Sequence, residues 1–188
     1  AGNFDTILVY PGTYYEKNIL IKKPVVIRGI NQPVLDGEKK FEIISIWSSN
    51  VTVEGFSLQN CPQSSMNDYA GIKIYNASNV FIRNNYLYGM FFGIYFQECS
   101  GCTASGNVLK SSGAEEVQVG NGIHCWKCDS MVIEKNDIRG HRDGIYFEFV
   151  TNSTITGNYS YGNLRYGLHF MFSHHNDYVS NTFENNGA

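Results

Sequence analysis

One motif recurs along the chain at a nearly constant interval: a glycine, then an aliphatic residue, then alternating side chains. It starts at Gly71, Gly93, Gly122, Gly144 and Gly167, so the intervals are 22, 29, 22 and 23 residues. Asparagine repeats in the same register, at Asn85, Asn107, Asn136, Asn158 and Asn181. Self-similarity with a period between about 20 and 50 residues is typical of solenoid proteins. This repeat therefore constrains the fold more than any other feature.

The segments inside each repeat are short and alternating, and none keeps apolar residues at helical spacing. The sequence thus predicts an all-β protein, a right-handed parallel β-helix of the pectate-lyase type with three short strands per coil and roughly seven coils. Equivalent residues then stack about 4.7 to 4.9 Å apart on successive coils. Stacked asparagines can exchange amide hydrogen bonds. An antiparallel sandwich, the alternative, gives no reason for one residue type to recur at this period.

The chain has 188 residues and a formal net charge of −3, which suits one domain. We expect residues 1–188 to form a single β-helix domain, the N-terminal part of a longer solenoid truncated after Ala188, because no capping segment follows the last repeat. Neither an apolar run of about 18 residues nor a basic run is present, so neither a bilayer nor nucleic acid is the expected partner.

Strand alternation predicts two outward columns next to the repeated glycines. One column consists of Lys73, Tyr95, His124, Tyr146 and His169, and the other of Tyr75, Gln97, Trp126, Glu148 and Met171. Aromatic side chains also stabilise pleated sheets, which is the structural interpretation of these columns. Exposed aromatic patches mark binding surfaces, so we interpret Tyr95, His124, Trp126 and Tyr146 as a binding face.

Three charged residues precede the glycines of two successive repeats. Arg142 and Arg165 occupy matching positions, with Asp143 next to Arg142. We add all three to the binding face as an anion or sugar contact, and a salt-bridged corner is the alternative. Two seven-residue insertions fall at the same corner, before Gly71 and before Gly122, and loops on a rigid scaffold often carry function.

Two Cys-x-x-Cys pairs, Cys99 with Cys102 and Cys125 with Cys128, have the spacing of a metal site. The repeat register argues against that interpretation, because Cys102 and Cys125 fall on different sheets. Cys99 and Cys128 both follow their glycines by six residues and stack, within the Cα range of about 4.4 to 6.8 Å for a disulfide. We predict stacked thiols or a disulfide at this pair.

His169 and Met171 lie two residues apart on one strand, and Glu148 lies one coil before Met171. An imidazole and a thioether are soft ligands that suit Cu(I). We therefore interpret His169, Met171 and Glu148 as a copper site, with an ordinary surface histidine as the alternative.

Many β-helix proteins cleave polysaccharides, which requires clustered carboxylates or a bound Ca²⁺. Here the carboxylates are scattered: Asp143 and Glu148 are five residues apart, which predicts opposite faces, and Glu115 and Glu116 lie in an insertion. We expect no catalytic residue. A carbohydrate-active β-helix, whether lyase, hydrolase or glycan binder, is the alternative function.

Five segments together resemble the NosD family of carbohydrate-binding and sugar-hydrolase (CASH) repeat proteins. The segments are 9–14, 23–29, 50–56, 142–145 and 163–171, the last reading Asn163-Leu164-Arg165-Tyr166-Gly167-Leu168-His169-Phe170-Met171. The first three are common to many such repeats, and the last two are more specific.

The resemblance implies a periplasmic accessory protein of an ABC transporter that assists copper delivery to nitrous oxide reductase during denitrification. Its implied partners are the transporter ATPase and permease, a copper chaperone and the reductase, and its implied cofactor is transiently bound copper. The periplasm also permits disulfides, in keeping with the stacked Cys99 and Cys128.

Overall fold

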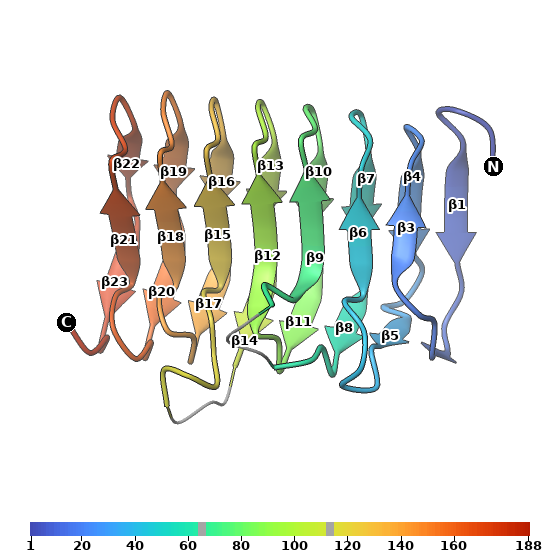
Figure 1. Ribbon diagram of the computed structural model, residues 1–188, viewed down its shortest axis with the longest axis horizontal. Coiled ribbons are helices and arrows are strands. Elements are labelled where there is room, and N and C mark those ends of the chain that lie inside the picture. The colour runs from blue at the N-terminus through green and yellow to red at the C-terminus, as the bar shows by residue number, and fades with distance from the viewer. Residues whose placement is uncertain (64–66, 112–114) are drawn as a thin grey trace.

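The computed structural model describes residues 1–63, 67–111 and 115–188. Its strands form three parallel sheets in which each strand pairs with the equivalent strand one coil away. Figure 1 shows the coils side by side along the long axis, with the two termini at opposite ends. The predicted all-β parallel β-helix with three strands per coil is confirmed. No helix in the described ranges is long and apolar enough to cross a membrane.

The first sheet contains β1 (Thr6–Val9), β4 (Val26–Gly29), β7 (Thr52–Glu54), β10 (Phe81–Arg83), β13 (Thr103–Ser105), β16 (Val132–Glu134), β19 (Thr154–Thr156) and β22 (Asp177–Val179). The second contains β2 (Thr13–Tyr14), β5 (Val34–Asp36), β8 (Ser57–Gln59), β11 (Tyr86–Tyr88), β14 (Val108–Lys110), β17 (Asp137–Arg139), β20 (Tyr159–Tyr161) and β23 (Thr182–Glu184). The third contains β3 (Ile19–Ile21), β6 (Ile44–Ile46), β9 (Ala70–Tyr75), β12 (Phe92–Gln97), β15 (Ile123–Trp126), β18 (Ile145–Glu148) and β21 (Leu168–Met171).

The repeated glycines stand where successive coils approach too closely for a side chain. A Cβ on Gly93 would lie 2.4 Å from Leu109 Cδ2 and 2.5 Å from the carbonyl oxygen of Gly122. A Cβ on Gly122 would in turn lie 2.6 Å from the carbonyl oxygen of Gly144. This crowding gives the 22-residue repeat a steric cause.

The predicted asparagine ladder is present at the turn between the first and second sheets. The amide Nδ2 of each member donates to the Oδ1 of the next, at 3.1, 3.0, 2.9 and 2.9 Å along the series Asn85, Asn107, Asn136, Asn158 and Asn181. The same side chains bond turn backbone, as when Asn107 Nδ2 donates to the Ile82 carbonyl at 2.9 Å. The ladder thereby satisfies polar groups that would otherwise be buried without partners.

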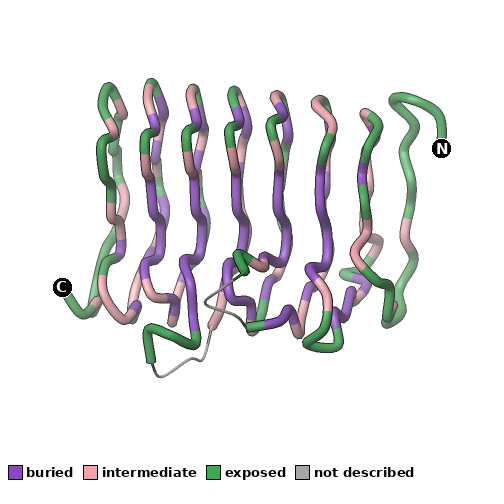
Figure 2. Tube along the Cα trace, in the orientation of Figure 1, coloured by how far each residue is buried: buried purple, intermediate pink, exposed green. Residues whose placement is uncertain are grey.

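Apolar columns fill the solenoid interior. Ile94, Ile123 and Ile145 stack in register on the third sheet and are fully buried, as are Phe96 and Phe147 on the same strands. Figure 2 shows this burial along the middle strands of the third sheet. Burial of each such side chain stabilises the fold by about 1.5 to 3 kcal/mol.

The two insertions connect the second sheet to the third, between β8 and β9 and between β14 and β15. Figure 1 shows both along one edge of the solenoid. Residues 64–66 and 112–114 of the insertions lie outside the described residues. The described part of each insertion borders the face of the third sheet that carries the candidate site.

Candidate binding cleft on the third sheet

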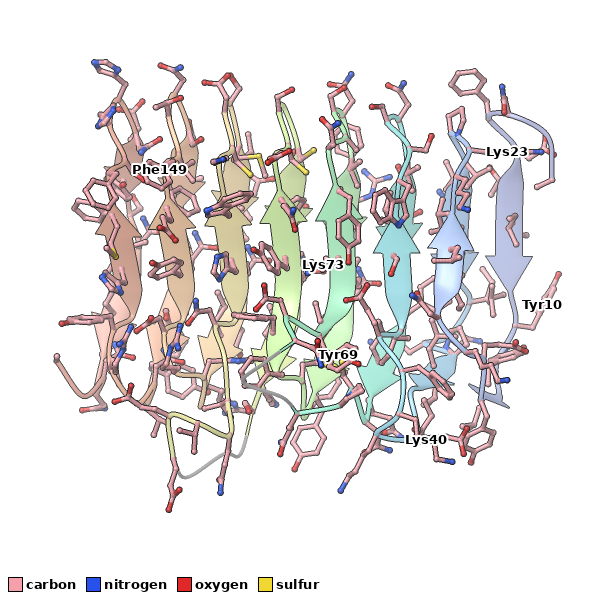
Figure 3. The ribbon with its side chains drawn as sticks, viewed as in Figure 1. Tyr10, Lys23, Lys40, Tyr69, Lys73 and Phe149 are labelled. Atoms are coloured by element: carbon pink, nitrogen blue, oxygen red, sulfur yellow. The ribbon has the colours of Figure 1, made fainter. Side chains whose placement is uncertain are left out.

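One outward column of the third sheet follows the register that the repeat predicts. Tyr95 pairs with His124, His124 with Tyr146, and Tyr146 with His169 on successive coils. Their ring centroids lie 4.4, 4.8 and 5.0 Å apart. Lys73 Nζ lies 4.5 Å from the centre of the Tyr95 ring, and Figure 3 labels Lys73 on this face. We call the series from Lys73 to His169 the aromatic column.

The aromatic column is more buried than the sequence indicates. Tyr95, His124 and Tyr146 are only 6%, 8% and 8% exposed, so the expectation that they form an open surface is wrong. The ring of Phe92, at the start of β12, lies 5.4 Å from that of Tyr95 and 5.1 Å from that of His124. Strand alternation predicts which way a side chain points. It does not predict that Phe92, from the corner at the start of β12, covers the column.

A cleft of about 430 Å³ remains between the column and this corner. Its lining consists of Asp68, Phe91, Phe92, Glu116, Val117, His124, Arg142, Tyr146 and Glu148. Three carboxylates face one guanidinium in this lining, so the cleft favours a cationic or neutral ligand over an anion. The volume lies within the range of about 300 to 1,000 Å³ that is usual for small-ligand sites. We call it the corner cleft.

His124 contributes an uncharged imidazole to the corner cleft. Burial, together with the nearby Arg142 and Lys73 cations, lowers the pKa of His124 to about 3. Asn121 Nδ2 lies 3.0 Å from His124 Nδ1, so this nitrogen accepts a hydrogen bond from the amide. His124 therefore stays neutral at physiological pH.

Asp143 organises the charged groups beside the cleft. Its fully buried carboxylate accepts hydrogen bonds from Arg165 Nε at 3.1 Å, from Arg165 Nη2 at 2.7 Å and from the Tyr166 N–H at 3.3 Å. His169 Nδ1 lies 3.5 Å from the same carboxylate, and Arg142 Nε lies 3.8 Å from it. The carboxylate raises the pKa of Arg165 above its ordinary value. The structure thus brings Arg142, Asp143 and Arg165 together as an ion-paired corner.

The expectation that Asp143 and Glu148 face opposite sides is wrong. Asp143 Oδ2 lies 3.5 Å from His169 Nδ1, and Glu148 Oε2 lies 3.3 Å from the hydroxyl of Tyr146, the partner of His169 in the same outward column. Asp143 precedes β18, which begins at Ile145, and strict alternation does not extend into the corner. Both carboxylates therefore reach members of the aromatic column.

Two of the three predicted copper ligands meet at Tyr146. The Tyr146 hydroxyl lies 3.2 Å from Met171 Sδ and 3.3 Å from Glu148 Oε2. The third, His169, stacks edge-on against the Tyr146 ring, and its Nδ1 lies 3.4 Å from Arg165 Nη2 and 3.5 Å from Asp143 Oδ2. Within the described ranges, no group of three or more His, Cys, Asp or Glu residues is arranged to hold a metal ion.

Trp126 stands in the second outward column, between Gln97 and Glu148 on the neighbouring coils. Its indole is partly buried, and Lys127 Nζ lies 4.3 Å from the centre of its ring. Trp126 does not line the corner cleft. Of the predicted binding face, His124, Arg142 and Tyr146 line the cleft, whereas Tyr95, Trp126, Asp143 and Arg165 do not.

The five cysteines are buried free thiols in this structure. Gln97 pairs with Trp126 and Ser100 with Asp129, so the register places Cys99 and Cys128 at equivalent positions of neighbouring coils. Cys99 and Cys128 therefore stack, as the register predicts. In the described ranges no group of three or more such side chains is arranged to hold a metal ion, in agreement with the interpretation that the two Cys-x-x-Cys pairs do not form one metal site.

Sequence reasoning missed a second hollow on the same sheet, closer to the N-terminus. It is lined by Glu42, Ser45 and Trp47 and by residues of the adjoining coils. Ser45 pairs with Lys73, the N-terminal member of the aromatic column. Extending both outward columns back by one coil would have reached Ser45 and Trp47, but this coil lacks the glycine that marks the repeat.

Comparison with known proteins places the fold among established ones. The family model "Right handed beta helix region" matches residues 40–188. The "Probable ABC transporter binding protein NosD" of Pseudomonas aeruginosa is 30% identical over 132 residues, which cover 69% of this chain and 31% of that protein. The match thus spans about a third of the length of this relative.

Two solved structures share the fold at low sequence identity. A proposed glycosyl hydrolase from Parabacteroides merdae has a TM-score of 0.64 at 12% identity and covers 85% of this chain and 83% of its own. The DFA-IIIase from Arthrobacter chlorophenolicus has a TM-score of 0.56 at 12% identity, over 94% of this chain and 57% of its own. Identities this low establish a shared fold alone. With the family model matching most of its length, the chain belongs to the right-handed β-helix family.

Proposed function

We propose that this β-helix is part of a periplasmic accessory protein of an ABC transporter and that its cargo is Cu(I). The proposed role is copper delivery for cluster assembly in nitrous oxide reductase, without catalysis by the chain itself. The similarity to NosD, which is named as an ABC transporter binding protein, supports the transporter link. The transporter ATPase and permease, a copper chaperone and the reductase are the proposed partners.

The observation that carries the proposal is the group of donors around Tyr146. Met171 Sδ and Glu148 Oε2 both contact the Tyr146 hydroxyl, and His169 lies on the same strand as Met171. A thioether and an imidazole are soft ligands that favour Cu(I). The three side chains project from the outer face of the solenoid, where a delivering or receiving protein can reach them.

Asp143 supplies the support that such a ligand set needs. Histidine ligands usually hydrogen-bond a carboxylate through the nitrogen that does not face the metal. Asp143 Oδ2 lies 3.5 Å from His169 Nδ1; in the tautomer with hydrogen on Nδ1 the carboxylate accepts from it, and Nε2 is the nitrogen that would bind copper.

An anaerobic Cu(I) titration against a competing chelator tests the proposal. In the double variant His169→Ala with Met171→Ala, we expect the affinity for Cu(I) at the proposed site to fall by more than about 100-fold. Loss of a residue that only supports a metal ligand already lowers affinity by about 10- to 100-fold. The matched control is His174→Ala with His175→Ala, which removes two imidazoles at the neighbouring corner. All five thiols remain in both variants. Equal affinity in the two variants would overturn the copper assignment.

A polysaccharide lyase function makes a different prediction. A lyase would release unsaturated products from acidic polysaccharides and would require clustered catalytic groups or Ca²⁺. We expect no rise in ultraviolet absorbance when the protein is incubated with polygalacturonate or alginate. Release of such products would overturn the proposal of a non-catalytic role.

A further inference from the structure

The corner cleft joins the two insertions to the outer face of the third sheet. Asp68 lines it from the first insertion and Glu116 from the second, and Figure 1 shows both insertions along one edge of the solenoid. His124 and Tyr146 line it from β15 and β18. The proposed copper site uses Glu148 alone among the lining residues, so the other groups have no role in that proposal.

Acidic side chains outnumber basic ones in and around the cleft. Arg165 offsets them only in part, because it lies 3.7 Å from Glu116 but also pairs with the buried Asp143 at 2.7 Å. Lys73 donates to the backbone carbonyl of Asp68 at 3.1 Å. The carboxylates in and beside the cleft are Asp68, Glu116, Asp143 and Glu148, and the cations are Lys73, Arg142 and Arg165. One negative charge is thus in excess, which favours a ligand of net positive charge.

Two hydrogen-bond donors line the same cleft. The imidazole of His124 is neutral and its Nδ1 accepts a hydrogen bond from Asn121, so the hydrogen is on Nε2. His124 is only 8% exposed, yet no described residue accepts a hydrogen bond from Nε2. Arg142 Nε is also buried without a hydrogen-bond partner in the described ranges, although it lies 3.8 Å from Asp143. Donors of this kind suit a carboxylate on the ligand.

Apolar rings border these polar groups. Phe91 and Phe92 have ring centroids 5.0 Å apart, and the Phe92 ring lies 5.1 Å from that of His124. Both phenylalanines line the cleft. A chain of methylene groups that ends in a charge packs its apolar part against such rings.

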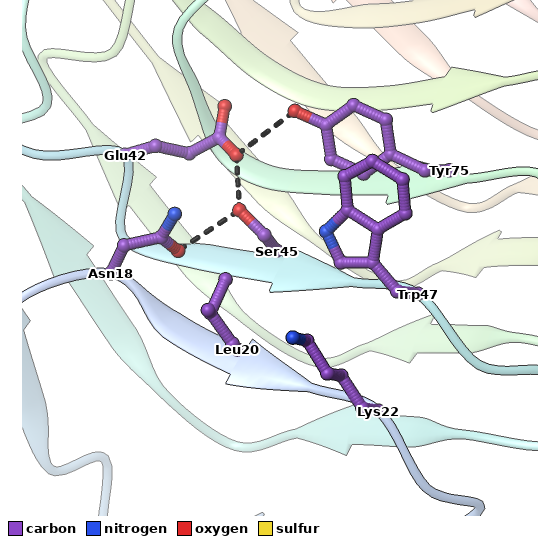
Figure 4. A pocket seen from close by; sticks show the side chains of 7 residues that line it. All are labelled: Asn18, Leu20, Lys22, Glu42, Ser45, Trp47 and Tyr75. Carbon is purple, nitrogen blue, oxygen red and sulfur yellow. Dashed lines mark hydrogen bonds between the residues drawn. The ribbon is translucent and has the colours of Figure 1, made fainter.

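The hollow near the N-terminus lacks this combination. Glu42, the one carboxylate among the described residues that line it, already accepts hydrogen bonds from the hydroxyls of Ser45 and Tyr75 (Figure 4). Lys22 in the same lining balances its charge. The excess of negative charge is therefore a property of the corner cleft and not of this neighbouring hollow.

We infer that the corner cleft binds a basic amino acid, a small zwitterion with one additional positive charge. Its α-carboxylate pairs with Arg142 and accepts the Nε2 hydrogen of His124, and its cationic groups meet the surrounding carboxylates. A volume of about 430 Å³ suits a ligand of this size. A lysine or arginine side chain within a partner protein offers the same cation, but it has no free α-carboxylate for the two donors.

Isothermal titration calorimetry with L-lysine and L-arginine tests the inference. At least one should bind with a Kd at or below about 100 μM. Three probes related to lysine separate the contributions: norleucine lacks the side-chain charge, cadaverine lacks the carboxylate, and Nα-acetyl-lysine amide imitates a lysine within a protein. Each should bind at least about 10-fold more weakly than lysine. If neither amino acid binds, or if any of the three probes binds as tightly as lysine, the inference is wrong.

Single variants then locate the site. Glu116→Gln should weaken binding of the amino acid by about 10-fold, whereas Glu115→Gln, the same change at an exposed neighbour outside the cleft lining, should not. Arg142→Gln should weaken binding of lysine but not of cadaverine. Far-UV circular dichroism and the melting temperature check that each variant is folded. Equal affinity in Glu115→Gln and Glu116→Gln would place the ligand elsewhere and overturn the inference. The copper variant His169→Ala with Met171→Ala should bind the amino acid normally, so the two proposals can fail separately.

Discussion

Removal of one amide from the asparagine ladder should destabilise the whole solenoid. The side chain of Asn107 is fully buried and takes part in four hydrogen bonds. Its Nδ2 donates to the Ile82 carbonyl at 2.9 Å and to Asn136 Oδ1 at 3.0 Å. Its Oδ1 accepts from the Asn85 backbone N–H at 3.0 Å and from Asn85 Nδ2 at 3.1 Å.

The magnitude follows from that inventory. A typical intramolecular hydrogen bond contributes about 1 kcal/mol net, so Asn107→Ala should lower the free energy of unfolding by about 4 kcal/mol. Because the groups left behind are buried, water cannot replace the lost partners without opening the turn. Domains are stable by only about 5 to 15 kcal/mol, so a loss of this size consumes a large share of the total.

Urea unfolding followed by circular dichroism measures this loss. With a slope of about 2 to 3 kcal/mol per molar, the midpoint should fall by about 1 to 2 M. The control is Gln118→Ala, which removes an exposed amide and should change stability by less than about 0.5 kcal/mol. A midpoint for Asn107→Ala equal to that of the control would refute the claim that the ladder stabilises the turns.

Three further predictions concern the charged and sulfur-bearing groups. Asp143→Asn should lower the free energy of unfolding, measured in urea, by about 2 to 3 kcal/mol. This is less than the loss of about 3 to 5 kcal/mol typical of breaking a fully buried ion pair, because Arg165 is partly exposed. An unchanged urea midpoint would contradict this prediction. Burial lowers the pKa of His124 to about 3 in the fold, so below about pH 6.5 the unfolded chain binds a proton that the folded protein does not. The free energy of unfolding should therefore fall as the pH is lowered from about 6.5 toward 3, and it should fall less in His124→Gln. Parallel pH profiles of the two proteins would argue against a buried neutral imidazole. Mild oxidation should link Cys99 to Cys128, with peptide mapping showing that pair, and a different pair would show that the thiol stacking is wrong.

The strand register could be predicted from sequence because it depends on local, repeated causes. Gly93 and Gly122 recur because backbone atoms of adjacent coils leave no room for a Cβ. Asn85 and Asn107 recur because each bonds the next. A residue that must fit its own copy one coil away leaves a visible period, so the partners of the outward residues from β9 to β21 followed from the glycine positions.

The environment of the site could not be predicted in the same way, because it depends on corners. Phe92 covers the aromatic column from a corner that alternation does not describe. Asp143 bends toward His169 from a position just before its strand. The hollow at Glu42 and Trp47 lies on a coil without the marker glycine. Neither the burial of the column nor this hollow leaves a period in the sequence.

X-ray absorption at the copper edge of the Cu(I)-loaded protein tests the proposed copper site most directly. Binding at His169, Met171 and Glu148 predicts a mixed shell, with one sulfur and the remaining ligands nitrogen or oxygen. That mixed shell should lose its sulfur in Met171→Ala. A shell of sulfur alone, unchanged in Met171→Ala, would place the ion on the buried thiols and contradict the copper assignment.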